Sequence, residues 1–533
     1  MDDPPAPVAA DGESLSIEDV VAVARGGATV KIPPPTREAI RTARERVEDV
    51  VESGEPVYGV NTGFGDLVAE RIPPDDLERL QYNLLRSHAA GAGDPLDTEV
   101  VRAMMLARLN TLAKGYSGVR EVVVEHLRTL LNEGVHPVVY SHGSLGASGD
   151  LIPLAHMAQV LVGEGEAALD GGEPGDRSER VPGEEALAAS GLDPLALEAK
   201  EGLALINGTQ LTVALAALLA YDGARTVTSA DVVGSLTTEV TMGTTATSDP
   251  VLHDVRPHEG QAASARNVKR CTADSEIVES HRNCDRVQDP YSIRCLPQVH
   301  GAVRDAVEHL SEAVTVELNS ATDNPLVFPA EAVDDRASGT ESAAILSGGN
   351  FHGEPLALRL DYVGTALTEL AAIAERRLDR LLNPHVQEDH LPPFLAAESG
   401  VESGYMLAQY TAASLLNEAR SLGPASTDNT PVSGAQEDHV SMSAQAAYNA
   451  RTALEAARTA VGIELLAATQ AAAYVDDDLS PGVGTGAAMA AVRELAPPLA
   501  EDRPLDDEIE GAAALVGPSL VERVARVIDD ELE

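Results

Sequence analysis

The stretch LALINGTQLTVALAALLAY, residues 203–221, decides the fold class of this chain. Ala and Leu, two of the best helix formers, make up most of this apolar run. The polar or small residues from Asn207 to Gln210 interrupt it, so it does not read as a membrane span, which needs about 20 consecutive apolar residues. We interpret the stretch as a buried helix that carries a polar patch.

Further Ala- and Leu-rich runs follow in the second part of the chain. Each exceeds the average helix of about 12 residues, and several helices of this length are typical of a helical bundle. Together with the first, the runs span residues 203–222, 298–320, 353–382, 403–423 and 443–474. The fold class that we expect is therefore mainly α, with a core of long bundled helices.

The first 200 residues are organised differently. Apolar residues recur with helical spacing in shorter segments, separated by loops rich in Gly and polar residues. These segments predict helices at residues 35–53, 77–88, 99–114 and 120–133. The acidic, Gly-rich residues 163–187 predict an exposed, irregular excursion. We expect an N-terminal region at 1–200 and a bundle region at 201–533, although the two could equally form one continuous unit.

The charge of the chain is strongly negative. Among its 533 residues, 85 Asp and Glu oppose 38 Lys and Arg, which gives a net charge of −47. Such a field repels nucleic acid and anionic membranes, so we expect neither as a partner. Acid spread along the whole chain with few lysines resembles the surface of a halophile's protein. In multi-molar salt the screening length falls to about 3 Å or less, which suppresses self-repulsion.

The three cysteines, Cys271, Cys284 and Cys295, form no C-x-x-C pair. Their odd number, and an N-terminus that does not resemble a signal peptide, favour reduced thiols and a cytoplasmic location. His281 precedes Cys284, but this spacing is not typical of a zinc site. The sequence therefore gives no reason to expect a metal ion.

The stretch GSLGASGD, residues 143–150, places three glycines around one small serine. Gly146-Ala147-Ser148 fits the start of the G-x-S-x-G nucleophile elbow, but Asp150 stands where the last glycine belongs. A phosphate-binding loop fits no better, because no G-K-[ST] closes the stretch. The residues alone leave open whether Ser148 is reactive or whether the stretch is a Gly-rich loop that leads into a helix near Leu151.

Chemically active side chains gather in the polar breaks between the expected helices. Each alone has an ordinary explanation: Glu437 as one of many solvated glutamates, for example, or Arg294 as a surface ion pair. The candidates are Tyr58, Asn61, Ser87, His88, Asn207, Gln288, Tyr291, Arg294, Phe351 and Glu437.

Seven segments occur in an order that a known family shares. They are YGVNTGFG (58–65), NLLRSHAAG (83–91), GSLGASGDLIPLAH (143–156), EGLALINGTQ (201–210), QDPYSIRC (288–295), SGGNFHGEP (347–355) and QEDHVSM (436–442). Together they closely resemble the histidine ammonia-lyases, within the aromatic amino acid ammonia-lyase family. The resemblance runs from about residue 35 to residue 490.

The resemblance implies a role for Ala147-Ser148-Gly149. In the family this tripeptide cyclises and loses two waters, giving the electrophilic group 4-methylidene-imidazol-5-one (MIO), and no external cofactor is needed. Ring closure brings the amide nitrogen of Gly149 to the carbonyl carbon of Ala147, which small side chains and a free backbone permit. A helix that starts near Leu151 would point its positive end toward the ring.

The implied reaction is the non-oxidative deamination of L-histidine to trans-urocanate and ammonia, the first step of histidine degradation. MIO captures the substrate's amino group, and Tyr58 removes a β-proton, which requires its pKa to fall from the ordinary value of about 10. The resemblance assigns the other roles as follows: Arg294 binds the carboxylate, Asn207 and Gln288 orient the substrate and the MIO oxygens, Tyr291 assists the ring, and Phe351 packs against it.

Two positions favour histidine as the substrate. Family members that act on phenylalanine or tyrosine carry Phe-Leu or His-Leu at Ser87-His88, and the phenylalanine enzymes carry glutamine at Glu437. A carboxylate is costly beside a phenyl ring but favourable beside an imidazole N–H. The alternatives are a phenylalanine or tyrosine ammonia-lyase, an MIO-dependent aminomutase and a non-catalytic paralogue. The resemblance also implies a homotetramer in which three subunits share each active site.

Overall fold

The computed structural model describes residues 5–54, 56–60, 77–172, 175–282, 286–334, 337–427, 430–528 and 531–533, so the candidates Asn61 and Cys284 lie outside the described residues. Internal contacts divide the chain into two compact units. The first unit comprises residues 1–218, 310–360 and 424–448, and the second comprises 219–309, 361–423 and 449–533. Each unit thus combines three stretches of the chain. The expected boundary at residue 200 stays a prediction.

Short helices build most of the first unit. They are α1 (Ile17–Ala24), α2 (Pro34–Ser53), α3 (Leu77–His88), α4 (Thr98–Ala113), α5 (Glu121–Asn132), α6 (Leu151–Leu161), α7 (Gly183–Ala189) and α8 (Glu201–Ile206). The four predicted N-terminal helices are confirmed to within one residue at each end. Helix α3 packs on α6 and α8, and α4 packs on α1 and α5. Every residue of α4 from Val100 to Ala113 is buried, so this helix is the core of the unit.

The single helix predicted over residues 203–222 is wrong. Helix α8 ends at Ile206, and α9 begins at Gln210 and continues to Val240. Asn207 between them is extended, with φ −89° and ψ 118°, and Gly208 has φ +137°, a conformation that favours glycine. The polar patch is therefore a break between two buried helices.

Small sheets, which the sequence did not predict, complete the first unit. Strands β1 (Val8–Ala9) and β2 (Val30–Lys31) pair, as do β3 (Ala92–Pro95) and β5 (Tyr140–His142). The order β4-β6-β7 joins His136–Pro137, Glu166–Ala168 and Arg180–Pro182, and the order β8-β10-β9 joins Leu326–Pro329, Ala343–Leu346 and Ser338–Gly339. The expectation of an irregular excursion at 163–187 is thus partly wrong, because this segment contains β6, β7 and the start of α7.

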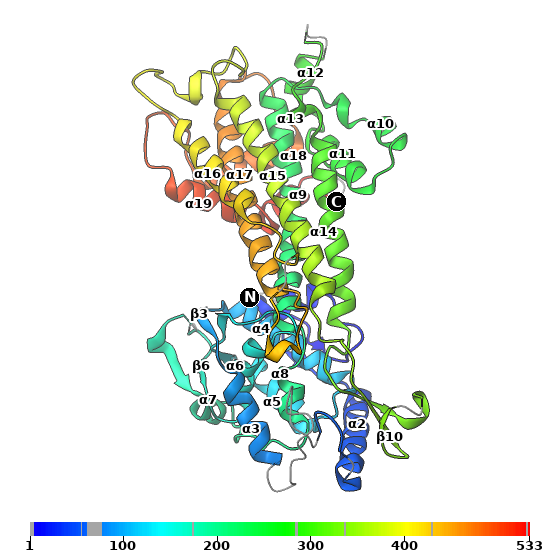
Figure 1. Cartoon of the computed structure of the whole chain (residues 1–533). Coiled ribbons are helices and arrows are strands. Elements are labelled where there is room, and N and C mark those ends of the chain that lie inside the picture. Colours follow the sequence, from blue (N-terminus) through cyan, green and yellow to red (C-terminus); the bar gives the residue numbers. More distant parts are fainter. Residues whose placement is uncertain are drawn as a thin grey trace. The chain divides into compact units, whose positions relative to one another are not determined.

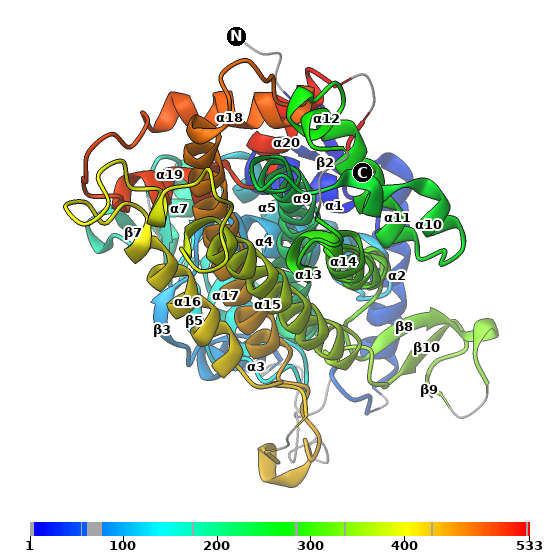
Figure 2. The same ribbon diagram turned by 90° about the horizontal axis from the view of Figure 1, so that it is seen from above.

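Long helices form the second unit, as expected for a mainly α fold. Helices α15 (Glu354–Leu382), α16 (Met406–Ser421) and α17 (Ser443–Ala471) lie side by side in two perpendicular views (Figures 1 and 2). Their neighbours are α9 and α14 (Leu296–Leu318), and α9, α14, α15 and α17 contribute residues to both units. The shorter helices are α10 (Pro250–Asp254), α11 (Glu259–Cys271), α12 (Glu276–Ser280), α13 (Tyr291–Arg294), α18 (Val483–Leu495), α19 (Asp506–Leu515) and α20 (Pro518–Ala525).

A buried polar network fixes the register of the long helices in the second unit. Arg377 on α15 makes two hydrogen bonds to Glu464 on α17, at 2.6 and 2.9 Å. His300 on α14 bonds through Nδ1 to Asp231 on α9 at 2.8 Å, and Arg304 donates to the same carboxylate at 2.8 Å. Since unpaired buried charges are costly, this pairing disfavours any slip of one helix along another. Among the described residues, we find no helix with the length and apolarity that crossing a membrane requires.

Candidate active site

A cavity of about 920 Å³ lies within the first unit. Its wall is assembled from the turn at residue 58, the end of α3, the loop before α6, the break between α8 and α9, and the segments 347–352 and 433–439. The sequence candidates that line it are Tyr58, His88, Ala147, Ser148, Asn207, Phe351 and Glu437. The fold thus brings together side chains from the full length of this unit.

Glycines shape the loop that carries Ser148. Gly146 and Gly149 have φ of +66° and +77°, in the left-handed region. Gly149 and Gly208 form an isolated parallel β-bridge. A Cβ atom on Gly149 would lie 2.2 Å from the carbonyl oxygen of Gly208. Only glycine fits at position 149, because any side chain would push the loop away from the helix break.

Asp150 ties the end of this loop to α9. Its fully buried carboxylate accepts hydrogen bonds from Ser144 Oγ at 2.6 Å, from the Thr212 amide at 2.8 Å and from Thr212 Oγ1 at 3.1 Å. Burial raises the pKa of Asp150, while these hydrogen bonds oppose the rise. The residue directly precedes α6, which begins at Leu151 as predicted, but its carboxylate makes no capping hydrogen bond to that helix.

Ser148 is held at both its side chain and its carbonyl group. Its Oγ donates to Glu437 Oε1 at 2.9 Å. Its carbonyl oxygen accepts from Asn207 Nδ2 at 2.9 Å and from the Gly208 amide at 3.4 Å. We call these contacts of Asn207, Gly208 and Glu437 the Ser148 clamp.

A buried arginine holds the helix break in place. Arg108 on α4 donates to the carbonyl oxygens of Ala204 and Asn207 at 3.0 and 2.7 Å, and to Gln210 Oε1. Burial lowers the pKa of Arg108 to about 10, although the charges of Asp323 and Asp150 oppose this. The guanidinium therefore stays charged at neutral pH, and it fixes the backbone from which the Asn207 side chain reaches Ser148.

His88 and Glu437 are two of the titratable residues that line the cavity, together with His352, Asp438 and His439. His88 Nδ1 lies 2.9 Å from the Leu84 carbonyl oxygen, which can only accept, so Nδ1 carries the proton. Burial lowers the pKa of His88, although this bond and the charge of Glu437 oppose the change. At neutral pH His88 is therefore a neutral imidazole. Ser87, expected to face the ring together with His88, is exposed and is not among the lining residues.

Gln288, Tyr291 and Arg294 belong to the second unit and lie close to one another. Arg294 donates to Gln288 Oε1, and its guanidinium carbon lies 5.5 Å from the centre of the Tyr291 ring. Tyr291 is 71% exposed. Of the described residues that line the first-unit cavity, none comes from this group.

Several residues that build the site are not evident from the sequence. Arg108 lies inside an apolar helix, and Gly208 falls within a run that reads as one continuous helix. Asp150 stands where the G-x-S-x-G motif has its last glycine. Because an acidic residue just before a helix is a typical N-terminal signal, the sequence could have identified this position. His352 and His439, which also line the cavity, lie inside two of the seven segments, but the resemblance gave them no role.

The structure holds the Ala-Ser-Gly loop, which lies in one of the seven segments that carry the sequence resemblance, against a break between buried helices. The aromatic amino acid lyase family model matches residues 15–494, and the chain belongs to this family.

Two relatives of the chain carry the same name. It is 61% identical to a probable histidine ammonia-lyase of Halobacterium salinarum, over 98% of this chain and 99% of the relative. It is 47% identical to the histidine ammonia-lyase of Gloeobacter violaceus, over 95% of both chains.

Solved structures share the fold over nearly the whole chain. The histidine ammonia-lyase of Trypanosoma cruzi superposes with a TM-score of 0.88 at 37% identity, covering 98% of this chain and 96% of the other. The tyrosine aminomutase of Streptomyces globisporus superposes with a TM-score of 0.90, also at 37% identity, covering 99% and 100%. These similarities confirm the mainly α fold class.

Proposed function

We propose that this protein is a histidine ammonia-lyase, a carbon–nitrogen lyase that converts L-histidine to trans-urocanate and ammonia. The observation that best supports this proposal is the Ser148 clamp. It holds the central residue of Ala147-Ser148-Gly149 in a cavity that Glu437 and His88 also line. Relatives of the same name, at 47% to 61% identity over nearly the full chain, support it.

The loop fits the MIO group that the family resemblance implies. Closing the ring requires a tight turn at Gly149, and the left-handed φ of +77° and the lack of a Cβ atom both permit it. Ala147 is buried, and Ser148 reaches the cavity. Once formed, the group supplies an electrophilic methylene that captures an amine.

The chain's own donors are placed to activate that methylene. Asn207 Nδ2 and the Gly208 amide donate to the carbonyl oxygen of Ser148, which would become the carbonyl oxygen of the ring. Fixed donors at such an oxygen would stabilise negative charge on it. The N-terminus of α6, which starts at Leu151, contributes in the same direction.

Glu437 and His88 are placed to select an imidazole. A carboxylate accepts a hydrogen bond from an imidazole N–H, whereas a phenyl ring leaves it buried and unpaired. The neutral His88 ring offers its Nε2 as a further acceptor, because its Nδ1 is committed to Leu84. A substrate imidazole satisfies both acceptors when both of its nitrogens carry protons. Both groups favour L-histidine over L-phenylalanine.

The remaining roles follow the family resemblance. Tyr58, which lines the cavity, removes the β-proton, and Phe351 packs against the ring. Arg294 binds the substrate carboxylate, Gln288 orients the substrate, and Tyr291 assists the ring. These last three are supplied by neighbouring subunits of a homotetramer, and the exposure of Tyr291 supports this.

A product assay tests the function. The protein is mixed with L-histidine in concentrated KCl, and urocanate absorbance and ammonia are measured together. Equal amounts of both are expected, and Ser148→Ala should lower the rate by at least about 1000-fold, because the electrophile cannot form. Ser141→Ala is the matched control, because Ser141 lies in β5, before the loop, and takes no part in the Ser148 clamp. Full activity of Ser148→Ala would overturn the proposal.

An aminomutase is the second candidate, since the tyrosine aminomutase superposes with a TM-score of 0.90. Such an enzyme returns the ammonia to the β-carbon. Chromatography of the same reaction separates the two cases: a β-amino acid that accumulates ahead of free ammonia identifies the mutase.

A further inference from the structure

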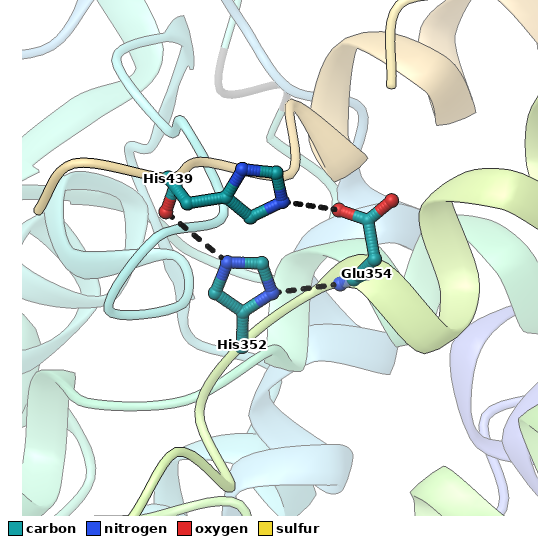
Figure 3. A group of neighbouring side chains, drawn as sticks. All are labelled: His352, Glu354 and His439. Atoms are coloured by element: carbon teal, nitrogen blue, oxygen red, sulfur yellow. Dashed lines mark hydrogen bonds and ion pairs between the residues drawn. The ribbon is translucent and has the colours of Figure 1, made fainter. Parts of the chain in front are cut away.

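Two histidines and a glutamate converge beside the cavity (Figure 3). His352 stands just before α15, Glu354 is the first residue of that helix, and His439 comes from the segment before α17. One ligand atom from each side chain lies within 4.8 Å of those of the other two. His352 and His439 also line the cavity, but the proposed reaction uses neither.

The two rings face the glutamate from the same side. They are stacked, with centroids 5.7 Å apart and planes 6° apart. His352 Nδ1 accepts from the Glu354 amide at 3.3 Å, His352 Nε2 lies 3.3 Å from the His439 carbonyl oxygen, and His439 Nε2 is 3.9 Å from Glu354 Oε2. These three contacts, drawn as dashed lines in Figure 3, are long for hydrogen bonds, and the first two are made to backbone atoms, so they constrain the three side chains only weakly.

Glu354 provides a second observation. Its Oε2 atom is shielded from solvent, yet it accepts no hydrogen bond from the residues that the structure describes. A carboxylate oxygen in this position loses its hydration without compensation. A cation between Oε2 and the two imidazoles would supply the missing partner.

We propose that His352, Glu354 and His439 bind a divalent transition-metal ion of the Zn²⁺ class. Two neutral imidazole nitrogens and one carboxylate oxygen are a typical donor set for such ions and leave a position open for water. Ligands of a tetrahedral zinc ion lie about 3.4 Å apart, so the three atoms must approach by roughly 1.5 Å or less. The side chain of His439, which is 63% exposed, has room to make most of this movement.

Donor chemistry separates this site from the rest of an acidic protein. Surface carboxylates prefer hard cations such as Mg²⁺, whereas imidazole prefers Zn²⁺, Co²⁺ or Ni²⁺. Thiols are the other soft ligands, and among the described cysteines Cys271 is buried while Cys295 is partly accessible. A test must therefore distinguish binding at this site from binding to surface carboxylates and from binding to cysteine thiols.

Cobalt provides the readout. The full-length protein, treated with a chelator and dialysed into concentrated KCl with excess Mg²⁺, is titrated with Co²⁺ and followed by visible absorbance. We expect one equivalent to bind with the intense bands of a low-coordinate site, and one equivalent of Zn²⁺ to displace it. Loss of one ligand in His439→Gln or Glu354→Gln should weaken binding by at least about 100-fold. His258→Gln, at an exposed histidine, and Cys295→Ser should change nothing.

The outcomes separate cleanly. No Co²⁺ binding beyond that of carboxylates overturns the proposal, as does binding that survives in folded His439→Gln and Glu354→Gln or disappears in Cys295→Ser. If one variant fails to fold, as judged by circular dichroism, His352→Gln replaces it. Because binding is measured without substrate, the result does not depend on the proposed lyase activity.

Discussion

Glu437 has two partners in the cavity. It accepts the Ser148 hydroxyl proton at 2.9 Å, and its charge acts on His88. In the proposed formation of MIO the Ser148 hydroxyl would leave as water, and the carboxylate would lose this donor. A substrate imidazole N–H would then replace it, so the proposal links maturation of the loop to choice of substrate through one residue.

Replacing Glu437 by glutamine keeps the shape but removes the charge. Glu437→Gln should lower kcat/KM for L-histidine by about 10- to 100-fold, since hydrogen bonds to charged groups contribute about 1.5–3 kcal/mol. Steady-state kinetics of urocanate formation measure this. The exposed Glu418→Gln is the matched control. Equal kcat/KM in Glu437→Gln and the wild type would show that the carboxylate does not contact the imidazole.

The individual residues differ in how well the sequence predicts them. Ser148, Asn207 and Glu437 lie within continuous motifs, so the family resemblance is enough to select them as candidates, and the structure places all three at the cavity. Arg108 cannot be identified in this way, because its bonds to the carbonyls of Ala204 and Asn207 join segments far apart in sequence. A buried cation that serves backbone atoms leaves no local pattern.

The loop before α6 and the break before α9 act as one element. Gly149 and Gly208 touch backbone to backbone, and Asp150 donates its amide to the Gly208 carbonyl at 2.7 Å. The break leaves Gly149 no room for a side chain, and the two segments together set the position of the Ser148 clamp.

Adding one methyl group tests this element. Gly149→Ala should lower the free energy of unfolding by about 3 kcal/mol or more and abolish urocanate formation, because the Cβ atom would lie 2.2 Å from Gly208 O at a left-handed φ. Gly171→Ala, at φ +85° with nothing within 4 Å, keeps the backbone strain without the collision and should cost only about 1 kcal/mol. Urea unfolding measures both. Similar losses in the two variants would contradict the account of tight packing.

Elements with strong periodicity are predictable, and the others are not. Helices α2, α3 and α5 repeat apolar residues at helical spacing, and their predicted bounds are close to the observed ones. The break at Asn207 escapes prediction because Ala and Leu on both sides favour one helix, while tertiary bonds from Arg108 favour the interruption. Strands of two to four residues, such as β4 and β6, are too short to show alternation.

Acid should destabilise the molecule through buried neutral histidines. Burial, aided by Arg102, lowers the pKa of His136 from 6.5 to about 4, and its Nδ1 has no hydrogen-bond partner among the described residues. As pH falls below 6.5 the unfolded chain binds the proton first, so this stability, present above pH 6.5, is lost as pH falls toward 4. Between pH 7 and pH 5 the loss is roughly 2 kcal/mol.

Urea unfolding at these two pH values checks this expectation. His136→Gln should show a smaller decrease than the wild type, and His258→Gln, at an exposed position, should show the same decrease as the wild type. An unchanged pH dependence in His136→Gln would contradict the assignment.

The net charge of −47 sets the response of the whole molecule to salt. Screening shortens from about 10 Å at 0.1 M salt to about 3 Å at 1 M, so self-repulsion of the acidic surface weakens. The unfolding temperature should rise steadily with KCl, and it should rise less with sucrose, which excludes itself from the surface without screening charge. Calorimetry compares the two. A midpoint that does not respond to KCl would remove the support for a halophilic origin, which stays a prediction, as does the cytoplasmic location.

The most direct test of the central claim is a competition among substrates. Equimolar L-histidine, L-phenylalanine and L-tyrosine are offered together, and urocanate, cinnamate and coumarate are separated by chromatography. If Glu437 and His88 select an imidazole, urocanate should exceed either other product by at least about 100-fold. Cinnamate or coumarate in excess would leave the loop chemistry standing and contradict the assignment of this cavity to histidine.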